Sequence, residues 1–123
     1  MKLMIDTWAW IEILTGTEKG KKAKELMKGK TIYTTSGNTY ELRYKLRERY
    51  GKKADEIIRS IIGNSVIVSI NDKISERASE IKFSKKGDIG AVDCFTLAAG
   101  ELIGAKVVTG DPHMKGMSNV IYL

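Results

Sequence analysis

The sequence of 123 residues contains one cysteine, Cys94, one proline, Pro112, and one histidine, His113. A single cysteine excludes an intrachain disulfide and suits a reducing cytoplasm. No apolar run is long enough to cross a membrane, and the short run that ends at Asp6 does not have the pattern of a signal peptide. Repeats and low-complexity segments are also missing. We therefore expect a cytoplasmic protein with one domain over residues 1–123.

Charge is the first positive feature. Lysine and arginine outnumber aspartate and glutamate by 21 to 15, which gives a formal net charge of +6. A basic protein attracts polyanions, and nucleic acid is the commonest polyanion in a cell. A lysine-rich surface that serves solubility, as in many thermophilic proteins, explains the same charge. Charge alone leaves both interpretations open.

Segments typical of strands alternate with segments typical of helices. We expect strands at 2–6, 30–35, 66–70, 106–109 and 119–122, and helices at 7–14, 17–28, 38–50, 54–63, 72–83 and 89–103. This alternation predicts an α/β fold, a single three-layer domain whose mostly parallel central sheet of about five strands has helices on both faces. Ligands of such sheets collect at the carboxyl ends of the strands. Asp6 and Asp111 each end a predicted strand there.

Four acidic residues lie at positions that favour metal binding: Asp6, Glu41, Asp93 and Asp111. Two like charges about 4 Å apart repel by roughly 4 kcal/mol at an effective dielectric constant near 20, so a converging set needs a cation. Oxygen ligands favour hard cations such as Mg²⁺ or Mn²⁺, which support in-line displacement at phosphorus. An acidic metal site on a basic protein predicts a phosphodiesterase that acts on nucleic acid.

Three of these acids have ordinary structural alternatives. Asp6 could cap the helix that follows it, by accepting a backbone N–H. Glu41 could complete a capping box whose cap is Asn38. Asp111 could form an Asx turn. Each alternative, taken singly, explains its residue at least as well as a metal does.

Asp93 is expected to differ from the other three. It lies inside the predicted apolar helix 89–103, where we assign the capping role to Asp88 and see none for Asp93. An ionised carboxylate buried there needs a cation or a basic neighbour. We prefer the cation to a salt bridge.

The order of these motifs resembles the PIN domain, and within it the VapC-type toxins of prokaryotic toxin–antitoxin pairs. The resemblance covers the whole chain. The matching segments, in order, are Ile5-Asp6-Thr7, Tyr40-Glu41-Leu42, Ala91-Val92-Asp93-Cys94-Phe95 with Ala98-Ala99, and Val107-Val108-Thr109-Gly110-Asp111-Pro112-His113. The last segment is the most specific, and all four in order make a strong match.

This resemblance implies a metal-dependent endoribonuclease that uses Mg²⁺ or Mn²⁺ to cut single-stranded or loop RNA and leaves a 5′-phosphate and a 3′-hydroxyl. It implies that the metal is held by Asp6, Glu41, Asp93 and Asp111, directly or through water, and that the Thr109 hydroxyl supports the site. It also implies a homodimer inhibited by a cognate antitoxin. A catalytically silent PIN-fold module that binds RNA or the antitoxin is the alternative.

Basic segments flank the first half of the predicted site. Close to Glu41 lie Arg43, Lys45, Arg47 and Arg49, which could track an RNA backbone or simply form a solvated helix face. Residues 17–30 are equally basic, and the resemblance implies that this region helps to form the antitoxin-binding cleft.

Three further side chains have structural and functional interpretations. Trp8 occupies a place where many relatives have serine or asparagine; it could stack on a base, but we prefer a core position. His113 could touch a phosphate, although a structural role is commoner for a lone histidine in a turn. Cys94 is expected to be a small core residue, because a hard-cation site has no use for a thiolate.

Overall fold

The computed structural model describes residues 1–123 and contains one parallel five-stranded sheet in the order β3-β2-β1-β4-β5. The strands are β1 (Lys2–Ile5), β2 (Thr31–Thr35), β3 (Val66–Val68), β4 (Lys106–Thr109) and β5 (Val120–Tyr122). The helices are α1 (Thr7–Thr15), α2 (Glu18–Met27), α3 (Ser36–Tyr50), α4 (Ala54–Gly63), α5 (Asp72–Ser84) and α6 (Ala91–Ile103), with short 3₁₀ turns η1 (Gly51–Lys53) and η2 (Pro112–Met114). The predicted α/β fold with a parallel sheet is confirmed.

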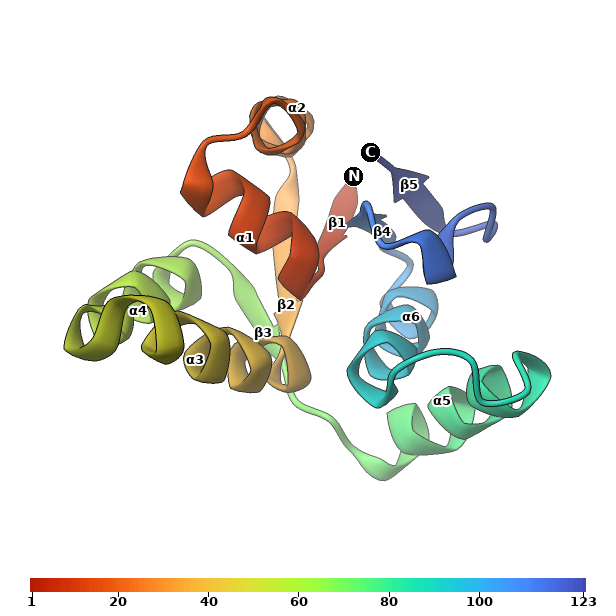
Figure 1. Ribbon diagram of the computed structural model, residues 1–123. Helices are drawn as coiled ribbons and strands as arrows, with labels where there is room; N and C mark the ends of the chain where they lie inside the picture. Colours follow the sequence, from red (N-terminus) through yellow and green to blue (C-terminus); the bar gives the residue numbers. More distant parts are fainter.

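The helices form two layers, one on each face of the sheet (Figure 1). Successive residues of a strand point to opposite faces, so Leu3 and Ile5 pack with α1 to α4, whereas Met4 packs with α5 and α6. In β4, Val108 joins the first cluster and Val107 the second. Apolar side chains on both faces explain why these strands read as continuous apolar runs in the sequence.

Strand order reverses at β1, which lies between β2 and β4. The chain runs outward from β1 to β2 and β3, and then returns to the other side of β1 to form β4 and β5. In parallel sheets such a switch point opens a crevice at the carboxyl ends of the two adjacent strands. Ile5 pairs with Val108 in register, so the residues that follow β1 and β4 lie side by side at that edge.

Close packing of α1 and α2 depends on one glycine. A Cβ atom at Gly20 would lie 2.0 Å from the carbonyl oxygen of Glu12, so no larger residue fits without moving the backbone of α1. The preceding Thr17 caps α2 by accepting a hydrogen bond from the Gly20 N–H at 3.0 Å. These two residues hold the basic helix α2 against α1. None of the helices combines the length and apolar character of a transmembrane segment.

Two predicted helix starts are wrong. Helix α3 begins at Ser36 with Thr35 as its cap, and Asn38 is the third helical residue of a capping box rather than the cap itself. Helix α6 begins at Ala91 after Gly90, not at Ile89 after Asp88. The apolar side chain of Ile89 misled the prediction, because it is buried in the core from a bend that precedes the helix.

The third strand is shorter than predicted and ends at Val68 instead of Ile70. The Ile70 N–H donates to the Ser36 hydroxyl at 3.0 Å, so its hydrogen bond ties the chain to the start of α3 and not to a neighbouring strand. Asn71 caps the next helix: its side chain accepts from the Ile74 N–H at 2.9 Å and opens α5.

Candidate active site

The four acids of the sequence prediction line one pocket at the switch point of the sheet. Its volume is about 270 Å³, and its walls are Asp6, Thr7, Trp8, Ile11, Glu12, Glu41, Lys45, Asp93 and Asp111. The carboxylates come from four different places in the fold. Asp6 follows β1, Glu41 lies in the second turn of α3, Asp93 lies in the first turn of α6, and Asp111 lies in the connection between β4 and η2. The fold thus brings together side chains that are far apart in sequence.

Asp6 has a local structural role as well as a place in the pocket. Its Oδ1 accepts the Ala9 N–H at 2.8 Å and caps α1, as the structural alternative predicted. The side chain is almost completely buried, and this burial raises the pKa of Asp6 to about 7. Hydrogen bonds from Thr109 and from the Ala9 N–H lower that pKa, whereas the nearby charges of Asp93 and Asp111 raise it. Asp6 is therefore a carboxyl that a cation would help to ionise.

Asp93 lies in the first turn of α6, so its predicted place in the interior of the helix is wrong, whereas no side-chain cap hydrogen bond is made at this helix start. A carboxylate near a helix N-terminus interacts favourably with the helix dipole. Its pKa is nevertheless raised to about 6, first by burial and then by the charges of Asp111 and Glu41. Raised pKa values in a pocket are typical of functional carboxyl groups.

Glu41 is oriented by a buried chain of polar side chains. The Thr7 hydroxyl donates to Oε1 of Glu41 at 2.7 Å, and Nδ2 of Asn38 donates to the Thr7 hydroxyl at 3.0 Å. The Asn38 Oδ1 accepts the Thr35 hydroxyl at 2.7 Å and lies 3.2 Å from the Thr96 hydroxyl. Sequence reasoning missed this network. Thr7 directly follows Asp6, but the contacts between Thr7, Asn38 and Thr96 span distant parts of the chain and leave no local pattern.

Asp111 is fixed by a short turn. Its Oδ1 accepts from the His113 N–H at 2.9 Å, which is the predicted Asx turn, and lies 2.8 Å from Nδ1 of the same imidazole. The Asp111 N–H donates to the Thr109 hydroxyl at 3.0 Å. Hydrogen bonding to Asp111 raises the pKa of His113, which favours the protonated imidazole. Thr109 is buried and links two of the four acidic residues, because its side chain forms hydrogen bonds with the Asp6 carboxyl group and with the Asp111 N–H.

Trp8 forms a wall of the pocket by packing against the turn that carries Asp111. A Cβ atom at Gly110 would lie 2.2 Å from the indole ring, so the ring and the Gly110 backbone are in direct contact. Trp8 is half-buried against the core, and the Lys19 ammonium group lies 5.7 Å from its ring centroid. Trp8 therefore packs against the core without being a buried core residue, and it faces the pocket as well.

Basic side chains lie on α3 beside the pocket. Lys45 lines the pocket itself. Arg43, Arg47 and Arg49 are exposed on the same helix, and Arg47 forms a 3.2 Å ion pair with Asp55. On the helix, Lys45 and Arg49 lie on one side and Arg43 and Arg47 on another, so of these four only Lys45 and Arg49 share the side next to the acidic pocket. Cys94, by contrast, is a buried core residue, as predicted.

The donor set fits a hydrated hard cation. No three of the Asp, Glu, His and Cys side chains are already placed to hold one ion, so the pocket is lined with carboxylates without forming a closed cage. Magnesium normally keeps several waters and binds directly to only one or two carboxylates. Oxygen-only donors, among which burial and neighbouring carboxylates raise the pKa values of Asp6 and Asp93, have the chemistry that such an ion requires.

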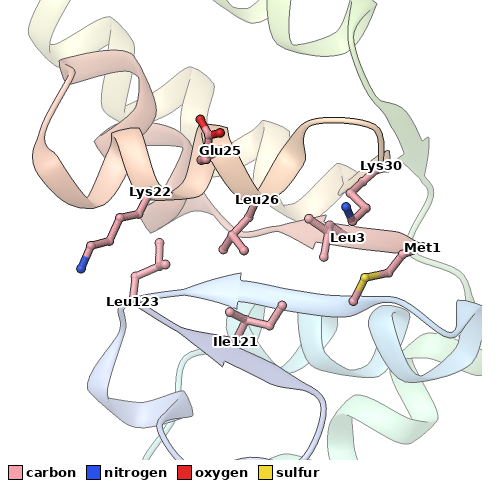
Figure 2. Close-up of a pocket in the computed structure, with 8 residues that line it drawn as sticks. All are labelled: Met1, Leu3, Lys22, Glu25, Leu26, Lys30, Ile121 and Leu123. Atoms are coloured by element: carbon pink, nitrogen blue, oxygen red, sulfur yellow. The ribbon is translucent and has the colours of Figure 1, made fainter.

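A second hollow, of about 470 Å³, lies between α2 and the β1–β4–β5 side of the sheet. Figure 2 shows Leu26 of α2 facing Ile121 and Leu123 of the C-terminal segment across this hollow. Its lining is mostly apolar, and it contains no cluster of groups able to perform acid–base or metal chemistry. The acidic pocket is therefore the candidate active site, although it is the smaller of the two.

Comparisons with known proteins agree with this architecture. The sequence pattern of the PIN domain matches residues 3–119, and no curated protein matches the chain. Similar solved structures include a toxin–antitoxin complex from Klebsiella pneumoniae, with a TM-score of 0.80, 18% identity and coverage of 97% of this chain and 95% of that chain.

Two further similar structures belong to VapBC systems. VapBC2 from Rickettsia felis, bound to a DNA fragment from its promoter, has a TM-score of 0.77, 20% identity and coverage of 100% and 98% of the two chains. Mycobacterium tuberculosis VapC20, a toxin that cleaves the Sarcin-Ricin loop, has a TM-score of 0.74, 20% identity and coverage of 96% and 98%. At such identities these similarities show a shared fold. Because the family pattern spans nearly the whole sequence and the fold agrees with it, this chain belongs to the PIN domain family.

Proposed function

We propose that this protein is an endoribonuclease that depends on Mg²⁺ or Mn²⁺ and acts as the toxin of a VapBC-type toxin–antitoxin pair in the cytoplasm. The observation that carries the proposal is the convergence of four carboxylates, from four separate parts of the fold, on one pocket beside a basic helix. Typical PIN domains are nucleases that use divalent metals. A charge arrangement of this kind suits a negatively charged phosphodiester that is neutralised by a cation.

The metal ligands in this proposal are Asp6, Glu41, Asp93 and Asp111, directly or through water. A bound divalent cation supplies an activated water and neutralises charge on the phosphate. Thr109 holds Asp6 and Asp111 in place through its hydroxyl.

Other side chains of the pocket have distinct tasks. Thr7 orients Glu41 by a direct hydrogen bond. Lys45, which is part of the pocket wall, is placed to attract the substrate phosphate. Trp8 closes one side of the pocket and reduces the room for bulk water.

The substrate in this proposal is single-stranded RNA or an RNA loop. The printed description of the similar VapC20 toxin, which cleaves the Sarcin-Ricin loop, supports a loop substrate. Similar chains solved in toxin–antitoxin complexes support a cognate antitoxin as protein partner, and we propose a homodimer as the working assembly.

Cleavage of end-labelled RNA tests the proposal. A single-stranded RNA and a stem-loop RNA are incubated with the purified protein and Mn²⁺, with excess EDTA, and with EDTA followed by added Mn²⁺. We expect cleavage that EDTA stops and Mn²⁺ restores, with 5′-phosphate products. Asp111→Asn should abolish cleavage, whereas the matched control Asp72→Asn, at an exposed position of α5, should not. Absence of any cleavage would favour the catalytically silent module.

A further inference from the structure

Two large aromatic side chains are exposed on α3 on either side of Glu41. Tyr40 is 65% exposed and Tyr44 is 56% exposed. They are separated by four residues, so they are neighbours on one face of the helix. Neither contributes to the hydrophobic core. Adjacent exposed aromatic side chains are typical of binding surfaces, not of inert ones.

This tyrosine pair adjoins the candidate active site. Glu41, which lines the acidic pocket, follows Tyr40 directly and precedes Tyr44 by three residues. Lys45, four residues after Glu41, also lines the pocket. Residues three and four apart on a helix are surface neighbours, so Tyr44 lies at the rim of the pocket. Glu48, four residues after Tyr44, is the main cause of a raised pKa at Tyr44, so a carboxylate lies beside this ring.

Both charge signs lie near the two rings, since Glu48 is beside Tyr44, but the four basic residues of α3 outnumber its two glutamates, Glu41 and Glu48. Arg43 and Lys45 lie between and beside the rings and take part in no ion pair, while Arg47 pairs with Asp55 at an exposed position. A polyanion complements this face. A second copy of the chain, docked symmetrically through the same face, would bring like charges together. The face therefore fits nucleic acid better than another copy.

We infer that Tyr40 and Tyr44 form a stacking platform for unpaired bases of the RNA strand that enters the acidic pocket. Aromatic side chains bind splayed bases of single-stranded RNA, and paired bases in a duplex cannot stack on them in this way. Arg43 and Lys45 would contact the phosphates on either side of the stacked bases. The inference rests on the proposed function for its ligand, and it adds a reason for preferring unpaired RNA.

Binding measured without cleavage tests the platform. Fluorescence anisotropy follows a labelled single-stranded RNA and a duplex of the same length, with EDTA present so that no metal-dependent cleavage occurs. The double variant Tyr40→Ala/Tyr44→Ala should weaken binding of the single strand by about tenfold or more, because loss of one base–aromatic stack typically costs about 1–3 kcal/mol. Duplex binding should change less than twofold.

Two controls separate stacking from other effects. Tyr40→Phe/Tyr44→Phe keeps both rings and should bind the single strand within twofold of wild type. Phe83→Ala removes an 86% exposed aromatic side chain from α5 and should also leave binding unchanged. Arg43→Gln should lower the slope of log Kd against log salt by about 0.7, whereas the double alanine variant should leave that slope unaltered.

The possible outcomes distinguish the platform from the nuclease activity. Unchanged single-strand affinity in the double alanine variant would overturn the platform even if the wild type cleaves RNA. A change in molar mass by light scattering, with RNA affinity unchanged, would also overturn it and would assign the face to contact between copies. Conversely, tyrosine-dependent binding by a wild-type protein that cleaves nothing would retain the platform and refute the proposed nuclease.

Discussion

The hydroxyl of Thr7 donates a 2.7 Å hydrogen bond to Oε1 of Glu41 and joins the start of α1 to α3 across 34 positions of sequence. Asn38 supports this contact, because its Nδ2 donates a hydrogen bond to the same hydroxyl at 3.0 Å. Glu41 therefore has a fixed partner before any cation arrives. Hydrogen-bond partners of this kind orient metal-binding carboxylates and tune their affinity.

Thr7→Val should impair the site without unfolding the protein. Valine has nearly the shape of threonine but cannot donate to Glu41, and loss of such supporting contacts typically lowers metal affinity or activity by about 10- to 100-fold. We expect a higher Mn²⁺ concentration for half-maximal cleavage and a nearly unchanged circular dichroism spectrum. Thr7→Ser keeps the hydroxyl and should behave like wild type. If Thr7→Val and Thr7→Ser cleave equally well, the Thr7–Glu41 bond has no role in the site.

Asn38→Ala should strongly destabilise the fold. Asn38 is 1% exposed and its side chain bonds to Thr7 and Thr35, so truncation leaves buried polar groups without partners and a small cavity. We expect a loss of about 2–4 kcal/mol in the free energy of unfolding, measured by urea titration. Asn64→Ala, at an exposed position after α4, is the control and should cost less than about 1 kcal/mol.

These contacts mark the limit of what the sequence predicts. Strands such as β1 and β4 are short apolar runs that end at an aspartate, so their ends and their neighbouring acids could be predicted from local pattern. The partners of Thr7 and Asn38 are brought together only by packing of α1, α3 and α6, and no local spacing encodes them.

Helix starts were predicted less well for a related reason. Ile89 resembles the first apolar residue of a helix, but it is buried from a bend before the helix, and Gly90 starts α6 without a side-chain cap. This error affects the interpretation of the site, because Asp93 was expected in the interior of the helix and in fact lies in its first turn. Its part in the pocket is then supported by its raised pKa and its neighbours, not by a misfit with helix propensity.

Stability of the metal-free protein should fall as pH rises from about 4 to about 7. The pKa of Asp6 is raised from 3.8 to about 7 and that of Asp93 from 3.8 to about 6, so the folded state holds more protons than the unfolded state in this range. The free energy of unfolding decreases with pH under that condition. Thermal unfolding in EDTA at a series of pH values measures the decrease.

Asp93→Asn should flatten this pH dependence. At pH 7.5 the metal-free variant should be more stable than wild type by about 1 kcal/mol, a value reduced from the full effect of the pKa shift because the side chain is partly exposed. Added Mn²⁺ should reverse the order, since it stabilises the folded wild type by mass action. A variant that is less stable than wild type at every pH in EDTA would instead assign Asp93 a structural role.

Gly110→Ala should disturb the pocket wall. The added methyl group would lie 2.2 Å from the Trp8 ring, so either the indole or the turn before Asp111 must move. We expect a loss of about 1–3 kcal/mol, which is typical of overpacking, together with weaker cleavage. Trp8→Leu in the same chain should recover part of the stability, and a double-mutant cycle by urea unfolding measures this coupling. Strictly additive effects would show that the two residues are not in contact.

Calorimetric titration of the metal-free protein with Mn²⁺ at pH 7.5 addresses the central claim most directly. The claim is that Asp6, Glu41, Asp93 and Asp111 line a pocket for a divalent cation. Wild type and Asp72→Asn should bind Mn²⁺ with the same affinity, whereas Asp93→Asn should bind it at least about tenfold more weakly. Equal Mn²⁺ affinity in wild type and Asp93→Asn, or no binding by wild type, would contradict the account.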